Sequence, residues 1–135
     1  MYLLDTNACI RILNNSSPSL IKRLRQQRPA EIALCTVVKA ELVYGARKSS
    51  RVAENLRVLD RFFEPFYSYP FNDNCVQAFG RIRSELERTG TPIGPYDLLI
   101  GATAVANDSI LVTANTREFS RVVGLNIENW EEEID

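Results

Sequence analysis

The sequence predicts an α/β protein in which a short, mostly parallel sheet of four to five strands has helices on both faces. Apolar runs too short for helices alternate with longer segments whose apolar residues recur at helical spacing. This alternation is typical of parallel sheets covered on both sides. The 135 residues suffice for one hydrophobic core, so residues 1–135 are expected to form a single domain.

The first half of the chain is expected to contain three strands and four helices. Residues 2–5 form a brief apolar strand, and Asn7 can cap a helix that ends near residue 14. Pro18 suits the first turn of a helix to about residue 27. A strand over 31–35 leads to Thr36, whose hydroxyl can cap a helix over 36–47. Helical apolar spacing predicts a helix over 51–63, and residues 65–70 form a short strand between two prolines.

The second half begins with a long helix over 74–89 that Asn72 or Asp73 can cap. Its buried stripe is expected to consist of Val76, Phe79, Ile82 and Leu86. Pro95 suits the first turn of the next helix, which runs to about residue 106 and is apolar nearly all round, as a central helix would be. A strand over 109–113, a helical turn over 115–119 and a strand over 126–129 complete the expected order.

Composition excludes several kinds of site. The chain has no histidine, so a catalytic or metal site built on histidine is ruled out. Its net charge of −1 gives no broad basic field for nucleic acid. Cys9, Cys35 and Cys75 are expected to be free thiols in a reducing compartment. No apolar run approaches the roughly 18 residues of a membrane span and no signal peptide is visible, so a cytoplasmic location is expected.

Three carboxylates lie in unusually apolar surroundings. Asp5 ends the first strand, Glu41 lies inside an apolar helix, and Asp97 opens the central helix. A carboxylate in such a place is unfavourable by several kcal/mol unless it is compensated. Taken singly, Asp5 could cap a turn, Glu41 could pair with Lys39 or Arg47, and Asp97 could stabilise a helix terminus. Together they indicate a shared cation.

The strand ends predict where these acids meet. Ligand sites of parallel sheets lie beyond the carboxyl ends of the strands. Asp5 follows the first strand there, and Asn115 comes just after the strand over 109–113. Oxygen ligands without histidine favour Mg²⁺ or Mn²⁺ over zinc. Such a cation activates water and stabilises charge on phosphate, so the chemistry expected is metal-dependent phosphodiester hydrolysis.

The ordered set of motifs resembles the PIN domain, and more closely the VapC toxins of bacterial type II toxin–antitoxin pairs. The resemblance rests on residues 2–7, 38–46, 92–102 and 111–119, with the end of the chain at 124–130 also similar, and it covers nearly the whole sequence. It implies a three-layer α/β/α sandwich. It also implies that Asp5, Glu41 and Asp97 are the acids that bind the metal.

The resemblance further implies a Mg²⁺-dependent endoribonuclease, with Mn²⁺ a substitute, that inhibits translation until a VapB-type antitoxin covers its site. The substrate would be RNA, with tRNA as one candidate. A homodimer and a toxin–antitoxin hetero-oligomer are expected, with no membrane association. Apolar residues on the first two helices, Ile12, Leu20 and Leu24, could receive an antitoxin helix or could face the core. Lys39, Arg47 and Lys48 could meet the RNA or the antitoxin.

One departure concerns the metal count. Many PIN domains have a fourth Asp where this chain has Asn115, which orients water or phosphate without adding charge. We therefore expect three carboxylates and one firmly held ion, with Thr6 and Thr113 as supporting hydroxyls. Two other functions stay open: a non-catalytic RNA- or protein-binding module, and a haloacid-dehalogenase-like phosphotransferase. The latter requires an acid two residues after Asp5, where this chain has Asn7.

Overall fold

The computed structural model describes residues 1–132, and its centre is a five-stranded sheet in which all neighbouring strands are parallel. The strands are β1 (Tyr2–Leu4), β2 (Ile32–Cys35), β3 (Tyr67–Tyr69), β4 (Ile110–Val112) and β5 (Ile127–Glu128). Their order is β3-β2-β1-β4-β5. The chain therefore proceeds outward from β1 in one direction, then returns to its other side at β4. This reversal is where parallel sheets open a ligand crevice.

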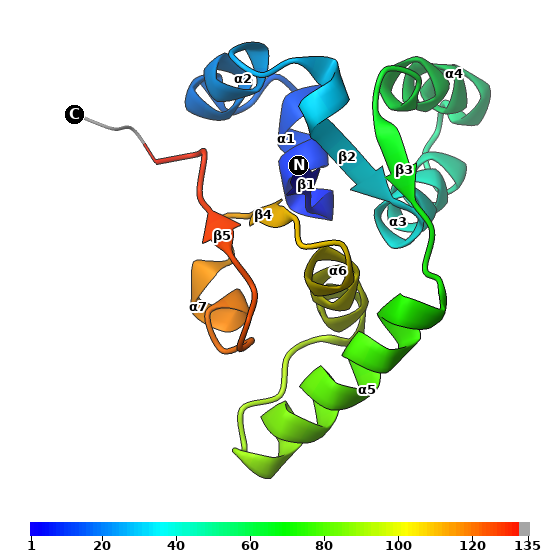
Figure 1. Cartoon of the computed structure of the whole chain (residues 1–135). Helices are drawn as coiled ribbons and strands as arrows, with labels where there is room; N and C mark the ends of the chain where they lie inside the picture. Colours follow the sequence, from blue (N-terminus) through cyan, green and yellow to red (C-terminus); the bar gives the residue numbers. More distant parts are fainter. Residues whose placement is uncertain (133–135) are drawn as a thin grey trace.

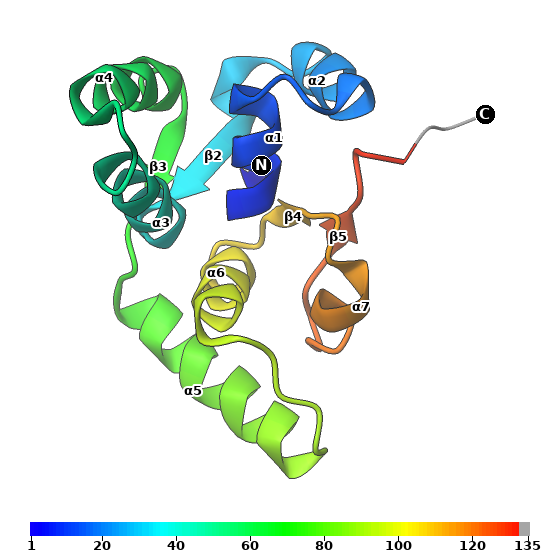
Figure 2. The same ribbon diagram turned by 180° about the vertical axis from the view of Figure 1, so that it is seen from behind.

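The helices divide into two layers around this sheet. They are α1 (Thr6–Leu13), α2 (Pro18–Arg25), α3 (Thr36–Arg47), α4 (Val52–Phe63), α5 (Asp73–Arg88), α6 (Pro95–Ala106) and α7 (Thr116–Phe119), with a 3₁₀ turn at Pro29–Glu31. In Figure 1, α1, α2 and α4 lie on one side of the sheet, and α5 and α6 lie on the other. Figure 2 shows the same division from behind. The expected three-layer α/β/α arrangement is confirmed.

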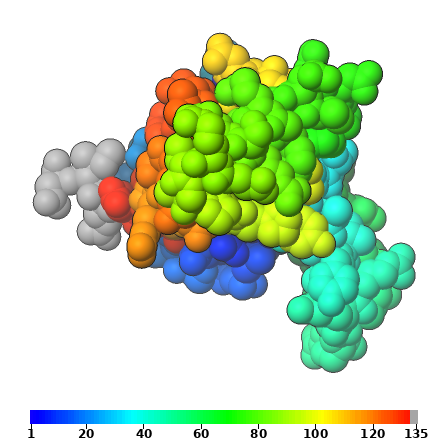
Figure 3. All heavy atoms as spheres, turned by 90° about the horizontal axis from the view of Figure 1, so that it is seen from below, coloured from blue at the N-terminus to red at the C-terminus, as the bar shows by residue number. Residues whose placement is uncertain are grey.

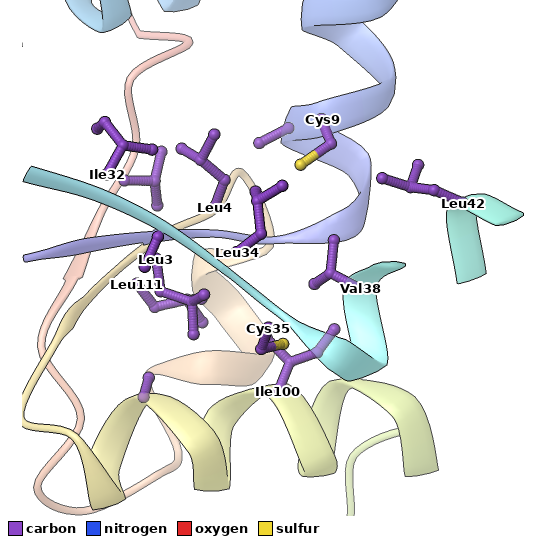
Figure 4. Packing of buried hydrophobic residues seen from close by; sticks show 14 of the residues in the cluster. Leu3, Leu4, Cys9, Ile32, Leu34, Cys35, Val38, Leu42, Ile100 and Leu111 are labelled. Carbon is purple, nitrogen blue, oxygen red and sulfur yellow. The ribbon is translucent and has the colours of Figure 1, made fainter. Parts of the chain in front are cut away.

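The core is continuous from the sheet into both helical layers. Leu3 on β1 pairs in register with Ala33 on β2 and with Leu111 on β4, and all three are fully buried. Figure 4 shows Val38 of α3 and Ile100 of α6 approaching Cys35 at the end of β2. Because α3 and α6 both pack at this strand end, their positions are fixed relative to the carboxyl edge of the sheet.

The structure corrects two predicted helix caps and confirms a third. Asp5, rather than Asn7, caps α1, and its carboxylate accepts a hydrogen bond from the amide of Ala8 at 2.8 Å. Cys35 precedes α3, and no side chain caps that helix, so Thr36 is its first residue rather than its cap. Asn72 does cap α5.

The expected stripe on α5 is wrong at Val76, which is 48% exposed. The helix packs on α6 through Ala78, Ile82 and Leu86. Val76 precedes Ala78 by two residues, which is about 200° around a helix, so it points away from α6.

The three cysteines are buried and free, as expected for thiols in a reducing environment. Burial raises the pKa of the Cys35 thiol to about 11. Within residues 1–132, no helix has both the length and the apolarity needed to cross a membrane.

Replacing Leu111 with Ala should destabilise the fold, because β4 carries the backbone that leads to Asn115. Leu111 is fully buried between β1 and β5. Leaving a cavity there should lower the free energy of unfolding by about 2–5 kcal/mol. Urea denaturation followed by circular dichroism measures the change. Val123→Ala, at a side chain that is 73% exposed, is the control and should change stability by less than about 0.5 kcal/mol.

Candidate active site at the carboxyl edge of the sheet

Asp5 lies at the centre of the candidate site, where β1 ends and α1 begins. Its side chain is only 3% exposed. Burial is the main cause that raises the pKa of this carboxyl, and the charges of Asp97 and Glu131 raise it further. The Thr113 hydroxyl and the Ala8 amide oppose that shift. Asp5 is thus both a helix cap and a buried acid, so the structural and the metal-binding roles are compatible.

Asp97 occupies the first turn of α6 and faces the same region. Burial, followed by the charges of Glu118 and Glu41, raises the pKa of Asp97, while the side chain of Asn115 opposes that rise. The Asn115 side-chain amide donates a hydrogen bond to Asp97 Oδ2 at 3.4 Å. Asp97 therefore interacts electrostatically with all the other acids: its charge repels that of Asp5, and the charges of Glu41 and Glu118 repel its own.

Glu41 projects from the middle of α3 and is held by a neighbour of Asp5. The hydroxyl of Thr6 donates a hydrogen bond to Glu41 Oε1 at 2.7 Å. The alternative pairing with Lys39 is not formed, because the Lys39 ammonium lies over the ring of Phe63 at 5.0 Å. Thr6 thus supports an acid, as predicted from its position.

Sequence reasoning missed Glu118. The Asn115 side-chain amide donates to Glu118 Oε2 at 3.3 Å while it also donates to Asp97, so it links these two carboxylates. The backbone amide of Asn115 donates to the hydroxyl of Thr113 at 2.9 Å. One signal in the sequence could have identified Glu118: it is an acid three residues after Asn115, just beyond the strand at the sheet reversal. Glu118 is thus a fourth carboxylate that lies beside the three expected acids.

No cation compensates these acids within residues 1–132. The ion pairs of this part of the chain involve other carboxylates, and none places a Lys or Arg nitrogen within 4.0 Å of Asp5, Glu41, Asp97 or Glu118. Asn115 supplies hydrogen bonds but no positive charge. Crowded carboxylates without cations repel one another, and a bound cation reverses this unfavourable arrangement.

These acids suit Mg²⁺, which keeps several of its waters, better than they suit a metal whose ligands all come from the protein. In the described part of the chain, no three Asp, Glu or Cys side chains stand together as ligands for one ion. Mg²⁺ is usually bound through one or two carboxylates and keeps several waters, so a complete protein cage is not required. Two of the four acids can contact the ion while the others hold its waters.

The comparisons define the class to which this fold and site belong. The model of the PIN domain family matches residues 2–125. Ribonuclease VapC2 of Rickettsia felis is 38% identical over 97% of this chain and 98% of its own. The tRNA(fMet)-specific endonuclease VapC of Salmonella typhimurium is 36% identical over 96% of this chain and 97% of its own.

Solved structures agree with this assignment. The structure of VapBC2 from Rickettsia felis bound to a DNA fragment from their promoter contains a chain with a TM-score of 0.89 and 37% identity, covering 96% of this chain and 98% of that one. The DNA-bound VapBC from Salmonella typhimurium contains a chain with a TM-score of 0.90 and 35% identity, covering 96% of this chain and 97% of that one. The protein belongs to the PIN domain family. Within that family it belongs to the VapC ribonucleases, and it is a nuclease of the hydrolase class.

Replacing Asp5 with Asn should stabilise the metal-free protein at neutral pH. Asn caps a helix as well as Asp does, so the bond from Ala8 survives while the buried charge is removed. Because the pKa of Asp5 is raised in the folded state, the wild type loses stability as the pH rises from the unfolded pKa through the folded one. The advantage of the variant should therefore shrink as the pH falls below about 4, where Asp becomes protonated in both states.

Thermal melting in the presence of a chelator, across a pH series, measures this difference. Asp73→Asn is the control, since Asp73 is an exposed acid in the first turn of α5. An Asp5→Asn variant that melts below the wild type at neutral pH would contradict the expected charge repulsion.

Proposed function

We propose that this protein is the toxin of a type II toxin–antitoxin pair, a Mg²⁺-dependent endoribonuclease that hydrolyses RNA and so inhibits translation. The observation that carries the proposal is the group of four carboxylates at the sheet reversal, with no Lys or Arg within 4.0 Å in residues 1–132. Relatives named as ribonucleases across nearly the whole chain support it. Cleavage of intracellular RNA and free buried thiols favour a cytoplasmic location.

Asp5 and Asp97 would hold Mg²⁺ directly, with Mn²⁺ a substitute, and Glu41 and Glu118 would hold its waters. When bound, the cation lowers the pKa of water and stabilises charge on the scissile phosphate. One firmly held ion stays our expectation, although the fourth carboxylate removes the reason first given for it. Asp5 is oriented by the Ala8 amide, and Asp97 by Asn115.

The remaining polar groups preorganise these acids. The Thr6 hydroxyl fixes Glu41, and the Asn115 amide sets the spacing between Asp97 and Glu118. The side-chain amide of Asn115 donates its hydrogens to two carboxylates, so its main role is to hold those acids in place. Its carbonyl oxygen remains an acceptor that can orient water. Hydrogen bonds of this kind hold reacting groups in one geometry, which is what a catalytic site requires.

The substrate is RNA, and tRNA is the leading candidate, because relatives are named tRNA(fMet)-specific endonucleases. The net charge of −1 gives no broad basic field to attract RNA. Selection would therefore depend on the shape of a loop and on contacts to unstacked bases. A non-catalytic binding module is the alternative, and absence of cleavage would favour it.

The partner is a VapB-type antitoxin, since the solved relatives are VapBC complexes. Of the two roles left open for the apolar residues of the first two helices, the structure supports the core: Leu20 is fully buried, and Ile12 and Leu24 pack against the core. A groove of 480 Å³ between α1, α3 and α4 is better suited, because its apolar rim includes Ile10 and Val58. These two side chains are 39% and 40% exposed. Homodimers and hetero-oligomers are also proposed.

An antitoxin bound in this groove would inhibit cleavage because the groove lies next to the acids of the site. Glu41 lines it together with Leu13 and Leu42, so a peptide in the groove reaches an acid of the site. Figure 3 shows the end of α3 and the start of α4, cyan to green, projecting from the body of the molecule.

Asp97→Asn should lower RNA cleavage by more than about 100-fold, because it removes a metal ligand rather than a supporting group. The amide is the same size, so the fold should persist. Sequencing of RNA 5′ ends after brief expression of wild type and variant measures both activity and cleavage position. A folded wild type that cuts no cellular RNA with Mg²⁺ or Mn²⁺ would rule out the proposed activity. Asp73→Asn is the matched control.

Thr6→Val should lower cleavage by about 10- to 100-fold, because Glu41 loses the hydrogen bond that orients it. Thr6→Ser keeps the hydroxyl and should retain most activity. The two rates at saturating Mg²⁺, measured on one RNA fragment, distinguish loss of the hydroxyl from a change in packing. Equal losses in both variants would indicate a packing effect instead.

Val58→Asp should weaken antitoxin binding by at least about tenfold, equivalent to about 1.4 kcal/mol, because it places a charge in the apolar groove. Cleavage by the free protein should not change. Isothermal titration with a VapB-type antitoxin measures the affinity. Val76→Asp is the control, since Val76 is 48% exposed on α5, outside the groove. Unchanged affinity for Val58→Asp would place the antitoxin elsewhere.

A further inference from the structure

A second cavity of 480 Å³, here called the tyrosine cavity, lies between α3 and α6, beside the acids. It is lined by Thr36, Val37, Ala40, Glu41, Tyr44, Tyr96 and Leu99. Its volume is in the range of pockets that hold small organic groups. Glu41 belongs to both the cavity and the acid cluster, so the two sites are continuous.

Two exposed tyrosines form part of its lining. Tyr44 is 66% exposed and Tyr96 is 59% exposed, although neither ring is needed to complete the core. Tyr44 follows Glu41 by three residues on α3, which places the two side chains on neighbouring faces of the helix. Tyr96 directly precedes Asp97 on α6. Each aromatic ring is thus attached to the same turn of helix as one acid.

The rest of the lining is apolar and small. Val37, Ala40 and Leu99 contribute aliphatic surface, and Ala40 lies one helical turn before Tyr44. The absence of a large side chain at residue 40 leaves room beside the Tyr44 ring. Thr36 adds an exposed hydroxyl that can donate or accept a hydrogen bond. A flat ring with polar edges suits this combination of aromatic surface and a few polar groups.

A positive charge borders the same cavity. The Lys48 ammonium lies 5.2 Å from the centre of the Tyr44 ring. Arg47 adds charge in the last turn of α3, whereas the charge of Arg51 is paired with Glu54. An anionic backbone that carries flat bases matches this arrangement, in which the acids would hold a cation and Lys48 lies over the Tyr44 ring.

We propose that the tyrosine cavity holds a base of the RNA substrate, from a nucleotide next to the scissile bond, stacked on Tyr44 or Tyr96. This rests on the proposed ribonuclease function and specifies how it selects unpaired RNA. Base stacking on aromatic side chains is the usual way in which single-stranded RNA is held, and it tolerates different sequences. A stacked base also fixes the phosphate beside Asp97 and Glu41, because the nucleotide connects the two sites.

A fluorescence experiment tests the stacking without relying on cleavage. Tyr96→Trp is combined with Asp97→Asn, and oligoadenylate is added in the presence of Mg²⁺. Stacking should quench the new indole, whereas the native Trp130, which is 1% exposed, should contribute a constant background. An abasic chain of the same length should not quench. Tyr67→Trp in the same background is the matched control, because Tyr67 is 58% exposed on β3, outside the cavity.

Kinetics on an RNA that the wild type cleaves give the second readout. Tyr44→Ala or Tyr96→Ala should raise KM about 5- to 150-fold, the equivalent of about 1–3 kcal/mol of stacking. The catalytic rate at saturation should change less. Tyr44→Phe and Tyr96→Phe keep the ring and should behave nearly as the wild type, and Tyr67→Ala should have no effect.

The outcomes separate the two proposals. Quenching by oligoadenylate with no cleavage by the wild type would overturn the ribonuclease function and support a base-binding site. Cleavage with equal quenching by the abasic chain, or with unchanged KM in both Ala variants, would overturn the stacking proposal. The proposal also fails if light scattering shows that Tyr44→Ala dissociates a dimer and the indole responds to protein concentration rather than to RNA. The tyrosine cavity would then be an interface between two copies.

Discussion

The site depends on the electrostatic repulsion among acids that the sheet reversal brings together. β1 and β4 are parallel neighbours, so the residues that follow them emerge at the same edge. Asp5 and Asn115 are placed there by backbone pairing, and the helices that leave and approach this edge add three more carboxylates. Burial and mutual charge raise the pKa values of Asp5 and Asp97. The metal-free fold contains an unfavourable arrangement that a divalent cation would relieve.

Several residues serve the fold and the site at once. Asp5 caps α1 with the same carboxylate that faces the acid cluster. Thr6 begins that helix and holds Glu41, which belongs to α3. Asn115 joins α6 to α7 through hydrogen bonds to Asp97 and Glu118. The geometry of the acids is therefore set by pairwise contacts between elements, and no separate loop is needed to position them.

Helix α3 lies between two surfaces with different roles. One surface faces the groove shared with α1 and α4, and the other faces the tyrosine cavity shared with α6. Glu41 lines both. A partner in the groove and a nucleotide in the cavity would thus contact the same carboxylate from two sides. This arrangement gives a physical route by which a bound protein could compete with RNA for the site.

The sequence by itself determined the order of elements, the parallel sheet and the acids Asp5, Glu41 and Asp97, because apolar periodicity and buried charge are local patterns. Only the tertiary structure decided that Glu118 joins them, since an acid on a single helical turn resembles any surface residue until α7 packs beside β5. It also decided that Leu20 is buried and Val76 is exposed. Those choices depend on which face of each helix meets its neighbours, and a helix alone does not specify its neighbours.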